Sequence, residues 1–476
     1  KNKPWALKPP LFLDSAIMLL YLVATSFFII GIKRLGSAAT ARSGNQLAAI
    51  GMLLGVAVTL FDQQILRYEW IVAGMVLGGL VGAVLARSVA MTSMPELVAL
   101  FNGLGGAASA LVAWGEWERV GAAGLGPDAL VTIGLSLLIG SITLTGSLMA
   151  FGKLNGFITG KPITFPAQNI LTIVLMASML VASGLFAWDP SVEMLFWIIL
   201  GGSLLLGVLT VLPIGGADMP VVISLLNSYS GLAASMAGFV LNNPLLIVSG
   251  ALVGAAGLIL TNIMCVAMNR SLLNVLFGSF GGGDSTAGGA DSAGTATDMI
   301  IKETNADDIA IQCGYANKVV IVPGYGLAVA QAQHVVKEVA TLLEQKGVEV
   351  LYGIHPVAGR MPGHMNVLLA EADVPYDQLY DMEQINSEFS TTDVVLIIGA
   401  NDVVNPAAKS NPGSPIYGMP VLNVQEAGRT IVFKRSLKPG FAGIENELFG
   451  AEQNQMFFGD AKKSLQDLVR ALKENE

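Results

Sequence analysis

Residues 318–327 read Lys-Val-Val-Ile-Val-Pro-Gly-Tyr-Gly-Leu, and this stretch decides the fold of the C-terminal part of the chain. It opens with a run of β-branched residues, which is typical of a strand buried on both faces of a parallel sheet. Gly324 and Gly326 then make a tight turn, and residues 327–345 have helical periodicity. A strand, a glycine turn and a helix in this order indicate a doubly wound α/β domain.

Further strands are predicted at residues 348–352, 394–398, 421–424 and 430–433, with helical segments between several of them. Strands that alternate with helices form a parallel sheet with helices on both faces. We therefore expect residues 309–476 to form a Rossmann-like α/β domain.

The turn at residues 324–329 is a variant of the glycine fingerprint that binds dinucleotides. Gly324 and Gly326 match its first two glycines, and Val329 stands where the third is usual. The first glycine makes the turn, and the second lets the backbone approach a pyrophosphate at the N-terminus of the helix. Two glycines alone are weak evidence, but the strand before them and the helix after them strengthen the prediction of a nucleotide site.

The ends of two strands indicate which nicotinamide nucleotide is bound. NAD sites carry an Asp or Glu at the end of the second strand for the ribose hydroxyl, whereas residues 353–356 read Gly-Ile-His-Pro. The strand at 430–433 is instead followed by Lys434, Arg435 and Ser436. Two cations and a hydroxyl suit a 2′-phosphate, so we expect NADP(H). A solvated basic pair is the alternative interpretation.

Two further segments have the character of ligand loops. Residues 355–363 hold a single arginine, Arg360, which is a candidate for contact with a phosphate. Residues 399–402 follow a predicted buried strand directly, where doubly wound folds bind ligands. Asp402 in this segment is a candidate acceptor for a hydrogen bond from an amide or a ribose.

The first 275 residues have a different character, because the chain is 53% hydrophobic and only 13% charged and its apolar residues gather here. Nine apolar runs lie near residues 12–32, 46–64, 70–90, 95–115, 127–150, 168–188, 192–213, 219–240 and 244–268. Runs of this length cross a bilayer as helices. We therefore predict an all-α membrane bundle at residues 1–275, followed by a flexible Gly/Ser/Ala-rich linker at residues 276–308.

The charges indicate orientation. One set of alternate loops holds Lys33, Arg34, Arg42, Arg87, Lys153, Lys161 and Arg270, and the opposite set holds only Arg67 and Arg119. By the positive-inside rule, the C-terminal domain faces the cytoplasm. Residues after 275 carry 14 Lys/Arg against 25 Asp/Glu. This acidic excess argues against a nucleic-acid partner.

Few polar side chains are expected inside the membrane. All three histidines lie in the C-terminal domain, at positions 334, 355 and 364. Asn102 and Asn227 are candidates to line a polar path, with an interhelical hydrogen bond as the alternative for each. Asp218 lies in a helix-breaking segment on the cytoplasmic side, among glycines and prolines.

Together these segments resemble the β subunit of proton-translocating nicotinamide nucleotide transhydrogenase. The resemblance covers most of the chain and is strongest at residues 321–333, 353–372, 398–408, 431–436 and 458–462, with further stretches at 94–98 and 212–229. It implies that hydride passes from NADH, held on a partner α subunit, to NADP⁺ held by this chain, while protons cross the membrane inward. It also implies α subunits that bring the NAD(H) domain and extra membrane helices, a dimer of such heteromers, and a bacterial inner membrane.

The resemblance further implies roles for individual residues. Contacts to the pyrophosphate fall to Gly324, Tyr325, Gly326, Val329, Val357, Ala358, Gly359, Arg360, Met361 and Pro362. The nicotinamide end lies near Tyr325, Gly399, Ala400, Asn401, Asp402 and Val403, with Tyr325 and Asp402 as the catalytic candidates. The 2′-phosphate falls to Lys434, Arg435 and Ser436, and a lid at residues 437–443 includes Leu437, Lys438, Pro439, Gly440 and Phe441. Asp460 and Ala461 complete the cofactor site, and Asp218 is a candidate to couple it to the proton path.

Two departures from the family pattern matter. Many members have a histidine where this chain has Asn102. Either a partner helix supplies the titrating group or water held by polar side chains carries the proton, and we expect the partner helix. A tyrosine is common where this chain has Phe441, so we expect a weaker lid. The alternative function is a transporter or channel gated by an NADP(H)-binding domain, which would need a charged or carbonyl-lined filter. A membrane-anchored NADPH reductase would need a flavin or metal site, for which the sequence shows no cysteine or histidine cluster.

Overall fold

The computed structural model describes residues 11–62, 68–90, 93–121, 124–189, 191–216, 218–269, 271–272, 275, 300–361, 363–414, 416–440 and 442–474. They form two compact units. The first unit contains most of the long helices and covers residues 1–213 and 224–259. The second contains the α/β fold and covers residues 214–223 and 260–476. Most of the predicted linker, residues 276–299, lies outside the described residues.

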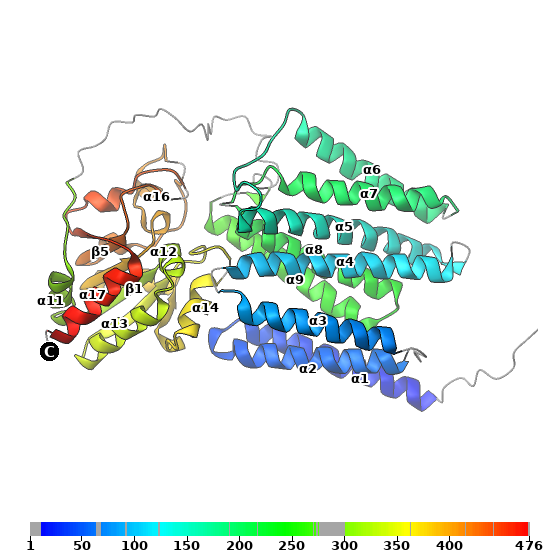
Figure 1. Cartoon of the computed structure of the whole chain (residues 1–476), viewed down its shortest axis with the longest axis horizontal. Coiled ribbons are helices and arrows are strands. Elements are labelled where there is room, and N and C mark those ends of the chain that lie inside the picture. The colour runs from blue at the N-terminus through cyan, green and yellow to red at the C-terminus, as the bar shows by residue number, and fades with distance from the viewer. Residues whose placement is uncertain are drawn as a thin grey trace, which may run out of the picture. The chain divides into compact units, whose positions relative to one another are not determined.

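Nine helices in the described ranges are long and apolar enough to cross a membrane. They are α1 (Leu11–Leu35), α2 (Ala38–Asp62), α3 (Glu69–Ser88), α4 (Met94–Val120), α5 (Pro127–Asn155), α6 (Gln168–Trp188), α7 (Glu193–Val211), α8 (Met219–Val240) and α9 (Pro244–Ala267). Figure 1 shows them from blue to green. Their bounds follow the nine apolar runs, so the predicted membrane bundle is confirmed.

Small residues bring helix backbones together in the bundle. A Cβ atom added to Gly106 of α4 would meet the carbonyl oxygen of Gly140 in α5 at 2.6 Å. One helix turn away along the same contact, Ser136 Oγ donates a hydrogen bond of 3.1 Å to the carbonyl of Ser109. Small residues at helix contacts allow such close approach in lipid, where apolar side chains gain nothing from leaving water. Ser136 therefore helps to pack these two helices together.

The helix α3 differs from the others. None of its residues is buried by the described part of the chain. A Cβ atom added to any of its four glycines would meet no heavy atom of the described structure within 4 Å. These glycines are Gly74, Gly78, Gly79 and Gly82. The spacing of these glycines suits a close helix contact, but the described residues do not supply that contact.

The second unit is built on a six-stranded parallel sheet of order β3-β2-β1-β4-β5-β6. The strands are β1 (Lys318–Pro323), β2 (Glu349–Ile354), β3 (Leu379–Asp381), β4 (Val394–Ile398), β5 (Arg429–Lys434) and β6 (Asn454–Phe458). Before the first strand, the chain at Glu303 already forms a parallel bridge with Met456 of β6. The predicted Rossmann-like sheet is confirmed.

Helices cover the sheet. The helices α11 (Ala306–Gly314), α13 (Gln333–Gln345), α14 (His364–Glu371) and α17 (Ala461–Glu474) pack on one another. The short helices α15 (Met382–Asn386) and η6 (Val424–Glu426) contribute Ile385 and Val424 to a second apolar cluster. That cluster also contains Val320, Val395 and Val432 from three neighbouring strands. Burial on both faces explains why the strands read as continuous β-branched runs.

The sequence prediction differs from the structure at three places. The helix predicted at 327–345 is broken into α12 (Tyr325–Val329) and α13, because Gln331 between them has a left-handed backbone with φ of 49°. Val421, Leu422 and Val424 are buried and Asn423 is half-buried, but residues 421–424 form no strand. The strands β3 and β6 were not predicted, because β3 has only three residues and β6 begins with Asn454 and Gln455.

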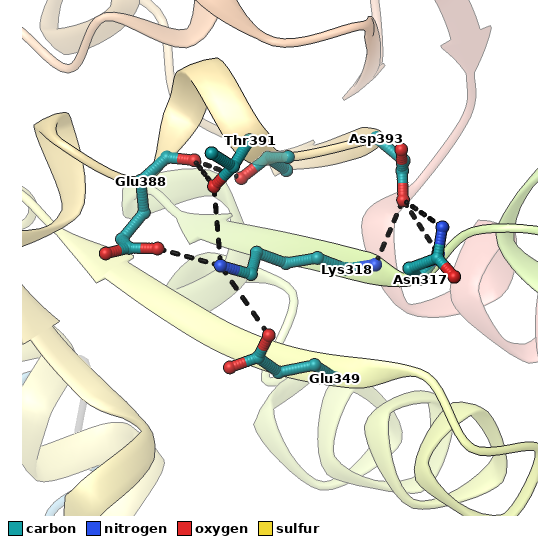
Figure 2. A network of polar contacts seen from close by, with 7 residues as sticks. Asn317, Lys318, Glu349, Glu388, Thr391 and Asp393 are labelled. Atoms are coloured by element: carbon teal, nitrogen blue, oxygen red, sulfur yellow. Dashed lines mark hydrogen bonds and ion pairs between the residues drawn. The ribbon is translucent and has the colours of Figure 1, made fainter.

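A polar network ties together the amino ends of three strands (Figure 2). Lys318 Nζ at the start of β1 lies 2.7 Å from Glu388 Oε2 and 3.6 Å from Glu349 Oε2 at the start of β2. Asp393 Oδ2, just before β4, accepts hydrogen bonds from the backbone N–H groups of Asn317 (2.7 Å) and Lys318 (3.1 Å). These two N–H groups lower the pKa of Asp393, and the bond to Glu388 raises the pKa of Lys318.

We expect Asp393→Ala to destabilise the α/β unit by about 1 kcal/mol, because two backbone donors lose a charged acceptor at a partly exposed site. Hydrogen exchange of the β1 amides in the purified protein measures this loss. The pKa of Asp393 is lowered by folding, so its contribution is complete above the ordinary carboxyl pKa and disappears as the pH falls below that value. Glu349→Gln is the control and should change little, because its side chain is 58% exposed. Equal exchange rates in wild type and Asp393→Ala at neutral pH would contradict the assignment.

Candidate functional site

The candidate site lies where the turn after β1 meets the turn after β4. The order of strands reverses between β1 and β4, and such a switch point is where open α/β sheets bind ligands. Gly324 N–H donates to the carbonyl of Ile398 at 2.8 Å, and Gly326 N–H donates to the carbonyl of Gly399 at 3.0 Å. A Cβ atom on Gly326 would lie 2.7 Å from the Cα of Gly399. The glycines therefore let two turns touch, in addition to any approach to a ligand.

A cleft of about 470 Å³ opens at this edge of the sheet. Twelve of the predicted site residues line it: Gly326, Val329, Gly399, Ala400, Asn401, Lys434, Arg435, Ser436, Lys438, Pro439, Asp460 and Ala461. They come from the turn after β1, the turn after β4, the end of β5 and the start of α17. The carboxyl ends of four parallel strands thus bring together segments up to 135 residues apart, which follows from the sheet topology.

Three lining residues were missed from the sequence, namely Ala330, Phe433 and Gly459. Phe433 is almost fully buried and belongs to β5, one residue before Lys434. Gly459 follows β6, has φ of 158°, and donates its N–H to the carbonyl of Lys434 at 3.1 Å. The Gly459-Asp460 turn before an amphipathic helix is a signal for this part of the cleft. Because β6 was not predicted, the sequence alone did not indicate that this turn lies at the sheet edge.

The cations at the cleft are held differently. Arg435 is exposed and carries a full positive charge. Lys434 instead points into the protein, where Nζ donates to Asn401 Oδ1 at 3.2 Å and to the carbonyl of Lys438. Burial lowers the pKa of Lys434, and the nearby Asp402 carboxylate partly opposes this. Lys434 therefore ties loops together, and Arg435 with Ser436 presents the side chains accessible to an anion.

The loop after β2 approaches the same edge from another side. The guanidinium carbon of Arg360 lies 4.7 Å from the ring centroid of Tyr325, a cation–π contact. The N–H of Arg360 donates to His364 Nδ1 at 3.0 Å. Ala358 is buried, whereas Val357, Gly359 and Met361 are partly exposed around Arg360, and Pro362 lies outside the described residues. This group does not line the cleft itself, nor does Gly324, which is buried against Ala400.

Asp402 contacts the predicted lid. One carboxylate oxygen, Oδ1, accepts from Asn401 Nδ2 at 3.0 Å, and Oδ2 accepts from the N–H of Ala442 at 3.0 Å. A Cβ atom on Gly440 would lie 2.6 Å from Asp402 Oδ1, so the chain passes close to this carboxylate. Val403 and Ala442 pack against the same apolar cluster, while Leu437 is exposed and Phe441 lies outside the described residues.

The family model described as NAD(P) transhydrogenase beta subunit matches residues 17–471. The chain belongs to the NAD(P) transhydrogenase beta-subunit family. Two sequences from Rhodospirillum rubrum named NAD(P) transhydrogenase subunit beta are each 51% identical over 464 residues, which cover 96% of this chain and 99% of each relative.

Family membership confirms the predicted transhydrogenase subunit, and with it an enzyme of the membrane that uses nicotinamide nucleotides. A beta subunit works with at least one other kind of subunit, as its name states. The gated transporter and the membrane-anchored reductase are therefore set aside.

Polar residues of this transhydrogenase subunit also lie within its long helices and between two of them. Asn102 is buried in α4 and is only 6% exposed. Asn227 is half-buried in α8. Asp218 is half-buried in the turn segment between α7 and α8, where the sequence predicted a helix break. Each residue has the burial expected of a polar group within a membrane protein.

His355 is a buried histidine in the loop that follows β2. Its Nδ1 accepts a hydrogen bond of 3.2 Å from the N–H of Val357, and its Nε2 lies 2.8 Å from the carbonyl oxygen of Pro420. A neutral ring with the proton on Nε2 satisfies both contacts. Burial lowers the pKa of His355 to about 4, a loss that the bond to Pro420 only partly opposes. His355 is therefore a neutral linker between two loops at physiological pH.

We expect the His355 ring to remain neutral down to about pH 5, since its pKa is about 4 when folded. The unfolded chain takes up a proton near pH 6.5, so the contribution of His355 to stability is complete above that pH. It falls by about 3 kcal/mol as the pH drops toward 4. The chain has 3 histidines, so ¹⁵N-histidine NMR with single His→Gln variants for assignment resolves His355. Titration of that ring near pH 6.5 would contradict this.

Proposed function

We propose that this chain binds NADP(H) in the cleft at the switch point and exchanges hydride with NAD(H) carried by a partner α subunit. The observation that supports this most directly is the composition of the cleft. It contains Arg435, Ser436 and Lys438, while the end of β2 carries His355 in place of an acid. A cleft with this charge favours a nucleotide that has a 2′-phosphate over one with free ribose hydroxyls.

Each group of residues has a proposed task. Arg435 and Ser436 bind the 2′-phosphate, because their side chains reach the cleft. The turn at Gly326 and Val329 meets the pyrophosphate, and Arg360 adds a positive charge beside Tyr325. Asp402 and Asn401 form the wall toward the nicotinamide end. The bound nucleotide itself supplies or accepts the hydride.

The second nucleotide is assigned to a partner. This sequence contains one glycine fingerprint, at Gly324 and Gly326, and so offers one dinucleotide site. We propose that α subunits bring the NAD(H) domain and further membrane helices, and that two such heteromers form a dimer. The membrane is the bacterial inner membrane, and the C-terminal domain lies in the cytoplasm on the side of the basic loops.

The membrane helices are proposed to carry protons inward. Asn102 and Asn227 line the path as hydrogen-bonding groups, but an amide does not titrate in the physiological range. The 3 histidines of the chain all lie after residue 330, so we propose that a helix of the α subunit supplies the titrating group. Asp218, between α7 and α8, is proposed to pass the protonation state to the nucleotide domain.

Arg435→Ala should weaken NADPH binding about 10- to 100-fold, since one charge-assisted contact to a phosphate is lost. NADH binding to the same chain should not change. Calorimetric titration of this chain, solubilised in detergent without its α subunit, measures both. Lys434→Ala should also weaken NADPH binding, with an added loss of stability from its contacts to Asn401 and Lys438.

The control for the lost charge is Lys473→Ala, which removes a cation paired with Glu338 on the outer helices. It should leave NADPH affinity within twofold of wild type. Wild-type binding of NADH as tight as that of NADPH would disprove the assignment of the cofactor.

Asn102→Ala should slow proton translocation at least tenfold, which corresponds to a rise of about 1.4 kcal/mol or more in the activation barrier, and leave NADPH affinity unchanged. The physical reason is the removal of a buried hydrogen-bonding group from the path. Proton uptake by reconstituted vesicles, together with NADPH titration, separates the two effects. Leu111→Ala on the same helix is the control, because Leu111 is 60% exposed and no part of the path. Normal proton uptake by Asn102→Ala would refute its role.

A further inference from the structure

Two buried asparagines join the loop after β4 to the base of the predicted lid. Asn405 is 0% and Asn446 is 1% exposed. Asn405 Nδ2 donates to the carbonyl of Glu445 at 3.0 Å, and Asn446 Nδ2 donates to the carbonyl of Asn401 at 2.9 Å. One bond is therefore donated by the loop after β4 and the other by the segment that follows the lid. The two bonds join residues that are 40 and 45 positions apart in the sequence.

Each asparagine also accepts a local hydrogen bond through its side-chain oxygen. Asn405 Oδ1 accepts from the N–H of Ala407 at 3.1 Å, and Asn446 Oδ1 accepts from the N–H of Leu448 at 2.9 Å. An aspartate performs this kind of local capping equally well. Only the amide adds an N–H donor, so the choice of asparagine matters for the long-range bonds.

The segments that these bonds join are the ones around the cofactor cleft. Asn401 lines the cleft, and the adjacent Asp402 accepts from the N–H of Ala442. Lys434 Nζ binds the side chain of Asn401 and the carbonyl of Lys438 at the other end of the lid segment. The lid segment is thus attached to the loop after β4 near both of its ends.

Apolar contacts extend the same connection. Val403 from the loop after β4, Val357 from the loop after β2, and Ala442 and Ile444 from the lid segment pack on one small cluster. Its buried members include Ile416 and Val421. Three cofactor loops consequently share one small core, and displacing one of them exposes apolar surface of the others.

We propose that Asn405 and Asn446 are positioning residues that fix the cleft wall at Asn401 and Asp402 to the base of the lid, so that release of the nucleotide requires breaking their two buried hydrogen bonds. This rests on the proposed function, because the nucleotide is taken to be NADP(H). Neither asparagine touches the cleft. Their effect passes through the backbone carbonyls of Asn401 and Glu445, and it sets how tightly and how long the nucleotide is held.

The test is Asn446→Asp and Asn405→Asp in the complete complex of this chain with its α subunit. Each variant keeps the local acceptor and removes the long-range donor. We expect NADPH dissociation, measured by its fluorescence after addition of excess NADP⁺, to accelerate about tenfold in each, since one buried hydrogen bond is lost. The KM for NADPH should rise by a similar factor, and the KM for NADH should stay within twofold of wild type.

Asn454→Asp is the matched control. Asn454 is 0% exposed, accepts from Thr430 Oγ1 at 2.9 Å, and donates Nδ2 to the carbonyl of Phe449 at 3.2 Å. It lies at the amino end of β6, whereas the cleft lies beyond the carboxyl ends of the strands. It should lower the melting temperature as the other two variants do, and leave NADPH dissociation within twofold of wild type.

Two results would overturn the proposal. Dissociation within twofold of wild type in both Asn446→Asp and Asn405→Asp would show that the bonds do not hold the nucleotide. Equal acceleration in all three variants would reduce the effect to general loosening. If one site variant fails to assemble, the other tests the same connection from its opposite side. A wild-type complex that does not bind NADPH would instead reject the proposed function, which this outcome separates from the role of the asparagines.

Discussion

The α/β domain depends on a contact of backbone with backbone, between the turn after β1 and the turn after β4. Gly326 N–H donates to Gly399, and no side chain fits between the two turns. Gly399 has φ of 67°, a conformation that favours glycine. Because this contact holds the two central strand ends together, the residues that follow each turn face one cleft. A methyl group at either glycine would separate the turns and with them the two walls of the site.

The remaining loops are held by polar side chains that span the cleft edge. Lys434, Asp402, Asn405 and Asn446 each bond to a loop other than their own. Buried polar groups are stable only when their hydrogen bonds are satisfied. Such a network therefore has a few well-defined arrangements and not a continuum. Under the proposed function, this property suits a domain whose affinity for a nucleotide responds to events elsewhere in the complex.

The membrane part of the chain is stabilised differently. Helices α4, α5, α8 and α9 approach one another through glycines and serines, whose backbones come within van der Waals distance. Helix α3 is also rich in glycine, but in the described structure its glycines meet no other helix at close range. Polar groups such as Asn102 are few and buried. Under the proposed function, such a bundle provides the frame of the proton path, and a helix of the α subunit supplies the titrating side chain.

The sequence by itself determined the nine helices, the strand at 394–398, the glycine turn after β1 and the cationic strand end at Lys434. Each of these depends on neighbouring residues: the length of an apolar run, a β-branched run, or a residue type directly after a strand. The tertiary structure alone decided the rest. Residues 421–424 are as apolar as a strand but fill a core without joining the sheet, and β6 pairs with β5 despite its polar start. Phe433, Gly459 and the two anchoring asparagines acquire their places from contacts across tens of residues, which no local pattern encodes.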